Sequence, residues 1–158
     1  MFKQLRLFAL LILPLALIGV TLHAYAQKKA GIEIRNVSKN DAQANKGLND
    51  NGRLTPVNFQ FICNGTDAGK FSDLEAVLET VNTDGARSRV IKRITDGTSN
   101  TLREERIDLP TPDGVFARDF KLTLRGKFRP GNAANPIEVS EVKTGSFPVP
   151  ANLIKPKN

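Results

Sequence analysis

Residues 116–128 show the most regular pattern of the chain, an alternation of apolar and polar side chains. The apolar parity holds Phe120, Leu122, Leu124 and Phe128. The polar parity is mostly basic and holds Lys121, Thr123, Arg125 and Lys127. Because successive side chains of a β-strand point to opposite faces, this segment should bury one face and expose the other. The pattern predicts a central strand around which the rest of the chain packs.

Six further segments combine short alternation with bounding turn residues, and each is expected to be a strand. They span 31–37, 56–63, 74–82, 87–94, 101–109 and 137–147. In the last of them the apolar parity changes between Val139 and Val142, which predicts a β-bulge near Ser140. Residues 38–54 are mostly polar, and their length predicts a long surface loop.

This series of about seven short strands predicts an all-β fold, a two-sheet antiparallel sandwich. The order of the strands resembles that of immunoglobulin-like or fibronectin type III-like domains, across residues 27–150. The resemblance is one of architecture, so it implies a fold and no particular activity.

Residues 71–94 fit two different structures. A capping box at 72–75 precedes apolar residues at helical spacing, which predicts a short helix near 73–82. The Asp84-Gly85 pair between two β-branched segments instead predicts a hairpin with a two-residue turn. The hairpin is the favoured interpretation, and its turn would place Leu78 opposite Ile91.

The first 26 residues have the features of a cleaved signal peptide. Lys3 and Arg6 precede a nearly continuous apolar run at 7–22, and Ala24-Tyr25-Ala26 offers small residues where a signal peptidase cuts. We expect cleavage after Ala26, with an uncleaved membrane anchor as the alternative. The protein is therefore expected to be secreted or periplasmic, with no stable membrane span after cleavage.

Cleavage would leave a β-sandwich domain at 27–150 and a flexible basic tail at 151–158. The 158-residue chain has a net charge of +7, and its first 26 residues contain two cations and no acid. The exported part therefore has a net charge of +5, which favours contact with anionic surfaces.

The composition of the exported part restricts its chemistry. The single His and the single Tyr lie in the predicted signal peptide, and the chain contains no Trp. Without His, the usual general base near neutral pH and the commonest metal ligand are missing. Motifs for nucleotide binding, serine hydrolases and zinc are also absent from the sequence. We therefore expect that the protein is not an enzyme and has no metal site and no cofactor. The alternative is a hydrolase that uses only carboxylate, Ser, Lys or Cys groups.

Cys63 is the only cysteine, so it has no partner for a disulfide within the chain. It shares the parity of Phe59 and Phe61, which favours a small buried residue over a reactive thiol. The exported part contains no His that could activate this thiol.

Basic side chains alternate along two of the expected strands. The candidates for anion binding are Arg87, Arg89, Arg93, Lys121, Arg125 and Lys127. They could act together on phosphates or sulfates only if both strips lie on one sheet face. The other interpretation is a solvated strand face and an edge strand protected by charge.

These patterns predict an exported, non-catalytic β-sandwich module with a binding or structural role in the cell envelope or outside the cell. Its partner would be a protein or an anionic envelope polymer, and no specific nucleic acid is expected. The alternative is a module whose basic face binds anionic polymers or membrane surfaces.

Overall fold

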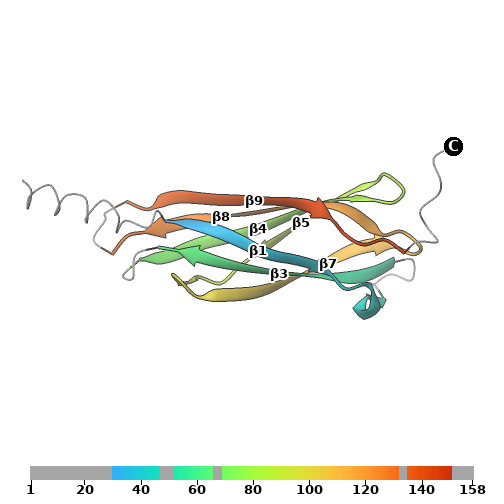
Figure 1. Ribbon diagram of the computed structural model, residues 1–158, viewed down its shortest axis with the longest axis horizontal. Coiled ribbons are helices and arrows are strands. Elements are labelled where there is room, and N and C mark those ends of the chain that lie inside the picture. Colours follow the sequence, from blue (N-terminus) through green and yellow to red (C-terminus); the bar gives the residue numbers. More distant parts are fainter. Residues whose placement is uncertain (1–29, 47–51, 66–68, 132–134, 151–158) are drawn as a thin grey trace, which may run out of the picture.

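The computed structural model describes residues 30–46, 52–65, 69–131 and 135–150 (Figure 1). Within them lie one short 3-10 helix, η1 (Asp41–Gln43), and nine strands. The strands are β1 (Gly31–Lys39), β2 (Asn45–Lys46), β3 (Gly52–Asn64), β4 (Lys70–Asn82), β5 (Arg87–Arg93), β6 (Gly97–Thr98), β7 (Leu102–Pro112), β8 (Ala117–Arg129) and β9 (Ile137–Ser146). No helix in this part of the chain is long and apolar enough to cross a membrane. The predicted signal peptide (1–26) and basic tail (151–158) lie outside the described residues and stay predictions.

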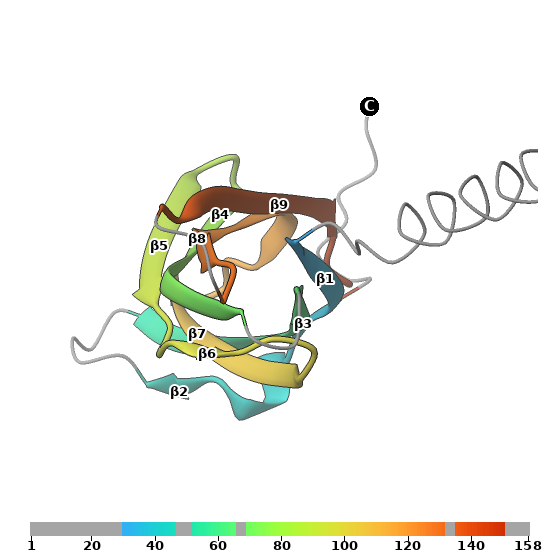
Figure 2. The ribbon, with the colours of Figure 1, turned by 90° about the vertical axis from the view of Figure 1, so that its left-hand side faces the viewer.

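Two antiparallel sheets pack face to face and confirm the expected all-β sandwich (Figure 2). Sheet A has the order β1-β3-β7, and β2 pairs with the start of β3. Sheet B has the order β5-β4-β8-β9, and β6 pairs with the start of β4. The strand with the regular alternation, β8, lies between β4 and β9, where its Leu122 and Leu124 are fully buried.

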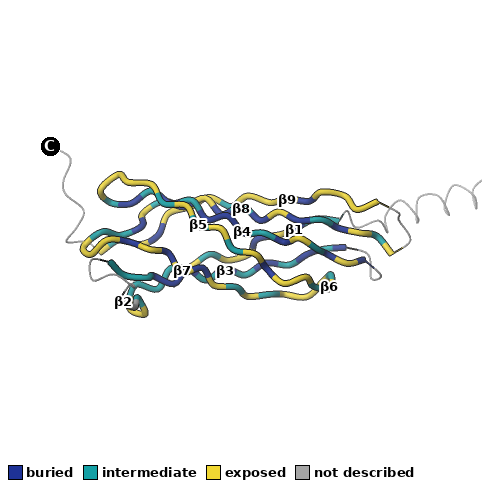
Figure 3. Tube along the Cα trace, turned by 180° about the vertical axis from the view of Figure 1, so that it is seen from behind, coloured by how far each residue is buried: buried dark blue, intermediate teal, exposed yellow. Residues whose placement is uncertain are grey.

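The core fills the space between the sheets, and exposed residues alternate with buried ones along the strands (Figure 3). Large buried side chains come from both sheets: Phe59, Phe61, Ile107 and Leu109 from sheet A, and Phe71, Leu74, Leu78, Leu122, Leu124 and Phe128 from sheet B. The rings of Phe71 and Phe128, on neighbouring strands, have centroids 4.8 Å apart. The side chains of the two inner faces thus form one apolar layer between the sheets.

The alternative of a helix near 73–82 is wrong, because this segment belongs to strand β4. The pairing of β4 with β8 is interrupted by a β-bulge at Asp73, whose φ is 54°. The bulge turns both Phe71 and Leu74 toward the core at a spacing of three residues. Val77 points to the outer face but is also buried by its neighbours. Apolar residues on both faces, together with the bulge, produce the helix-like spacing in the sequence.

β4 and β5 form the favoured hairpin, but the expected register was wrong by one residue. A three-residue turn replaces the two-residue one: Gly85, with φ of 87°, donates its N–H to the carbonyl oxygen of Asn82 at 3.0 Å. A turn followed by a left-handed glycine is a common three-residue hairpin connection. Ile91 consequently lies opposite Val77 instead of Leu78. The shift places Ile91 on the outer face of sheet B.

Two smaller expectations also differ from the structure. β9 pairs with β8 without a register shift, so the bulge expected near Ser140 is absent from this strand. The change of apolar parity instead means that Val139 faces the core and Val142 faces solvent. The segment 38–54 is more than a loop, since β1 continues to Lys39 and is followed by η1 and β2.

Lysine side chains close both seams between the sheets. The edge strands β1 and β9 meet on one side, where Lys143 Nζ donates to the carbonyl oxygen of Arg35 at 2.8 Å. The edge strands β5 and β7 meet on the other side, where Lys92 Nζ donates to the carbonyl oxygen of Arg106 at 2.8 Å. Lys92 also pairs with Glu105 of β7 at 2.8 Å. Charged side chains at edge strands discourage the addition of a foreign strand, which leaves the outer faces as the surfaces open to a partner.

Candidate functional site

All six candidate cations lie on the solvent side of sheet B, which we call the B face. Directly opposite residues of neighbouring strands share a face, so the register defines its membership. β5 contributes Arg87, Arg89, Ile91 and Arg93, which lie opposite Val81, Glu79, Val77 and Glu75 of β4. β8 contributes Asp119, Lys121, Thr123, Arg125 and Lys127. The two basic strips therefore occupy one face, with the acidic residues of β4 between them.

The three candidate cations of β8 are each paired with a carboxylate of β4. Lys121 Nζ lies 3.3 Å from Glu79 Oε2, and Arg125 Nε lies 3.0 Å from Glu75 Oε1. Lys127 Nζ lies 3.0 Å from Asp73 Oδ2, and this hydrogen bond raises the pKa of Lys127 above its ordinary value. The charges of these three cations are thus balanced by carboxylates within the sheet.

The three arginines of β5 are exposed, and none of them takes part in an ion pair with another described residue. Arg89 lies directly opposite Glu79, and Arg93 directly opposite Glu75, but both carboxylates bind the β8 cations instead. A guanidinium offers several N–H donors in a planar fork that matches a carboxylate or phosphate. β5 therefore presents guanidinium donors that no described carboxylate pairs with, whereas Lys121, Arg125 and Lys127 of β8 are each paired.

An apolar row crosses the B face between the charged rows. It consists of Ile91 on β5, Val77 on β4 and Val142 on β9, with Thr123 of β8 between the valines. Ile91 and Val142 are each 49% exposed, whereas Val77 is 6% exposed. An apolar strip with a charged border is the composition that protein-binding surfaces show.

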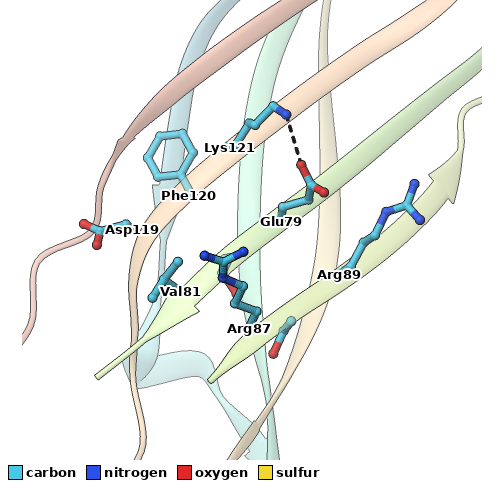
Figure 4. A pocket seen from close by; sticks show the side chains of 9 residues that line it. Glu79, Val81, Arg87, Arg89, Asp119, Phe120 and Lys121 are labelled. Carbon is cyan, nitrogen blue, oxygen red and sulfur yellow. Dashed lines mark ion pairs between the residues drawn. The ribbon is translucent and has the colours of Figure 1, made fainter. Parts of the chain in front are cut away.

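A shallow concavity of about 480 Å³ lies at one end of the B face, between β5, β4 and β8 (Figure 4). Arg87 and Arg89 line it from β5, and the Lys121–Glu79 ion pair bridges the two other strands. Asp119 also lines it and accepts hydrogen bonds from its neighbours on β8 and β9, Arg118 Nε and Ser146 Oγ, at 2.8 Å each. These bonds, with that from Arg118 the larger cause, hold the pKa of Asp119 below its ordinary value. Both carboxylates of the concavity are therefore paired, and its two arginines form no ion pair within the described part of the chain.

A second concavity of about 420 Å³ surrounds the bulge of β4 at the opposite end of the B face. It has two cations, Arg93 and Lys127, and three carboxylates, Asp73, Glu75 and Asp96. Because acids outnumber bases there, this end is a poorer anion site than the end with Arg87 and Arg89.

Cys63 faces the core and is 1% exposed, so the interpretation of a buried apolar residue is confirmed. Burial raises the pKa of its thiol from 9.0 to about 11, although the charge of Arg103 acts in the opposite direction. The thiol is therefore protonated at neutral pH and has no access to solvent. Among the described residues, no cluster of His, Cys, Asp and Glu could hold a metal ion.

Sequence reasoning missed a buried cation at the end of β1. The side chain of Lys39 is 1% exposed, and its Nζ lies 2.9 Å from Asp41 Oδ2 and 3.0 Å from the carbonyl oxygen of Ala117. The ring of Phe116, just before β8, and the ring of Phe147, just after β9, both face this ammonium. Each ring centroid lies 5.6 Å from Nζ. A register shift in β1 reverses its parity, so alternation could not show that Lys39 points inward. This ammonium is buried and held by Asp41 and Ala117, so it serves the fold and does not reach a ligand on the surface.

No protein-family model matches the chain, and a search of curated proteins finds no match.

Proposed function

We propose that the protein is an exported, non-catalytic β-sandwich module that binds a partner through the B face. The observation that carries this proposal is the exposed apolar row of Ile91 and Val142 beside three arginines that form no ion pair with a described residue. The closed seams support it, since they restrict binding through an added edge strand. Export rests on the signal-like sequence of the first 26 residues.

The strand order supports the fibronectin type III-like form of the sandwich. In constant-type immunoglobulin domains the fourth strand joins the sheet of the first and second strands. Here the fourth long strand, β5, pairs with β4 in the opposite sheet. This arrangement forms the wide B face, because it places four long strands side by side.

The test combines export and binding. All 158 residues are expressed in the source cell, and the exported protein should begin at Gln27 on N-terminal sequencing. Immobilised protein should retain envelope material, and the Ile91→Ser, Val142→Ser double variant should lose that retention. Leu102→Ser is the matched control, because Leu102 is equally exposed, at 49%, on sheet A. Equal losses in the control and the double variant, or turnover in hydrolase assays, would contradict the proposal.

The second candidate function is binding of anionic polymers or membrane surfaces. The observation that favours it is the presence of all six candidate cations on one face. It predicts salt-sensitive retention on heparin that is lost in the Arg87→Glu, Arg89→Glu double variant. Charge reversal at Lys121 or Arg125 is a weaker test, since it also breaks ion pairs with β4. Unchanged retention in the β5 double variant would exclude this function for the B face.

A further inference from the structure

Resting on the proposed function, we infer that the B face recognises an acidic protein segment, whose carboxylates bind Arg87 and Arg89 while an apolar side chain covers Ile91. The inference concerns the class of partner, which the proposed function leaves open. It follows from the spacing of side chains on β5, from the distribution of charge on the B face and from the apolar row.

The spacing of β5 fits an extended polypeptide. Arg87, Arg89, Ile91 and Arg93 are alternate residues of one strand, so neighbouring members are about 6.6–6.8 Å apart. An extended partner segment repeats its own side chains at the same distance. Acidic residues at two alternate positions, followed by an apolar residue two positions further on, would meet two arginines and Ile91 in register.

The charge distribution disfavours a polyanion. Glu79 and Glu75 form an acidic column on β4 between the two basic strips, and Glu138 of β9 lies opposite Lys127. A polymer with uniform negative charge, or an anionic bilayer, would have to lie against these carboxylates as well as the arginines. A protein segment can place acids over β5 and neutral groups over β4. Patterned charge of this kind gives specificity for one partner over others.

The apolar row favours a peptide over a sulfated or phosphorylated polymer as the ligand of the B face. Ile91 and Val142 gain from burial only if the ligand has apolar side chains to cover them. Sulfate and phosphate groups on a sugar or phosphate backbone offer little apolar surface. A second copy of this chain is a poorer occupant, because a chain with a net charge of +7, or +5 without its first 26 residues, repels itself.

The test is a selection of random dodecapeptides displayed on phage against the immobilised protein, expressed from all 158 residues. We expect the enriched peptides to contain at least two Asp or Glu at alternate positions and a nearby apolar residue. Their affinity should fall at least tenfold in Arg89→Glu and in Ile91→Ser. It should be unchanged in Arg35→Glu and Leu102→Ser, which alter exposed residues of sheet A. A peptide with its matching acid changed to Lys should regain binding to Arg89→Glu.

Heparin oligosaccharides and vesicles containing phosphatidylglycerol are tested on the same variants at the same salt concentration. Tighter binding of either than of the peptides, unaffected by Ile91→Ser, would overturn the inference in favour of a polymer or a membrane. Enriched peptides without acids, peptides indifferent to the β5 variants, or a dimer of the chain that covers Ile91 would also overturn it. In those cases retention of envelope material could still support the proposed function. Failure of every ligand and of the envelope retention would overturn both.

Discussion

Glu79 and Arg89 lie directly opposite each other in the β4–β5 hairpin, yet the carboxylate of Glu79 pairs with Lys121 of β8. Arg89 of β5 and Lys121 of β8 both neighbour the Glu79 carboxylate, and Lys121 forms the ion pair with it. Arg89 remains available although an acid is its closest cross-strand neighbour. The charge that the B face offers to a partner is thus set by pairing inside sheet B.

Glu79→Gln should strengthen binding of anions to the B face. The substitution keeps the shape of the side chain and removes a negative charge from the concavity that Arg87 and Arg89 border. We expect the variant to elute from a heparin column at a higher salt concentration than the wild type. Stability should change by less than about 1 kcal/mol, because exposed ion pairs contribute little. Glu33→Gln removes an exposed ion pair on sheet A and is the control; an equal shift in its elution would contradict the prediction.

Gly126→Ala should destabilise the protein through the bulge of β4. A Cβ at Gly126 would lie 2.6 Å from Cδ2 of Leu74 and 3.1 Å from the carbonyl oxygen of Ser72. Leu74 is 1% exposed, so it has little room to move. Overpacking of this kind costs about 1–3 kcal/mol, which urea unfolding would measure. Gly31→Ala is the control, since no heavy atom lies within 4 Å of its added Cβ; equal losses in both variants would disprove the steric cause.

The strands could be predicted from the sequence because their alternation is mostly unbroken. From Phe120 to Phe128 of β8, every second residue is buried, as the alternation predicts. The hairpin register could not be predicted, because Asp84-Gly85 is compatible with turns of two and of three residues. The structure selects three, with Gly85 in the left-handed region. A shift of one residue exchanges the faces of a strand pair, so this turn decides what Ile91 contacts.

The residue types of the candidate site could be predicted from the sequence, but the ion pairs among those residues could not. Alternating basic residues identified both strips, and nothing in the sequence required them to share a face. Which cations stay free depends on β4, whose acids could serve either neighbouring strand. The sequence offered all six cations alike, whereas in the structure Lys121, Arg125 and Lys127 pair with acids of β4 and Arg87 and Arg89 pair with no described carboxylate. Pairing across a sheet depends on side-chain reach, which sequence spacing does not specify.

The thiol of Cys63 should be inert in the folded protein. Because burial raises its pKa to about 11, the folded state favours the protonated thiol. The corresponding stabilisation is present below pH 9, the ordinary thiol range, and is lost as the pH rises through 11. We expect Ellman's reagent at pH 8 to modify Cys63 only as fast as the protein unfolds, with rates that increase in urea. Rapid modification of the native protein would contradict the burial of this side chain.

Lys143→Met should open the seam between β1 and β9. The Lys143 ammonium donates to the carbonyl oxygens of Arg35 and Ile34 at 2.8 and 3.3 Å, beside the register shift of β1. Methionine preserves much of the apolar stem but leaves both oxygens without this donor. We expect faster amide hydrogen exchange in β1 and β9 and a greater tendency to self-associate, since two sheet edges lose their charged bridge. Lys70→Met removes an exposed lysine of β4 that has no ion pair with a described residue, and its exchange should match the wild type. Unchanged exchange in β1 of the Lys143 variant would show that the core alone keeps the seam closed.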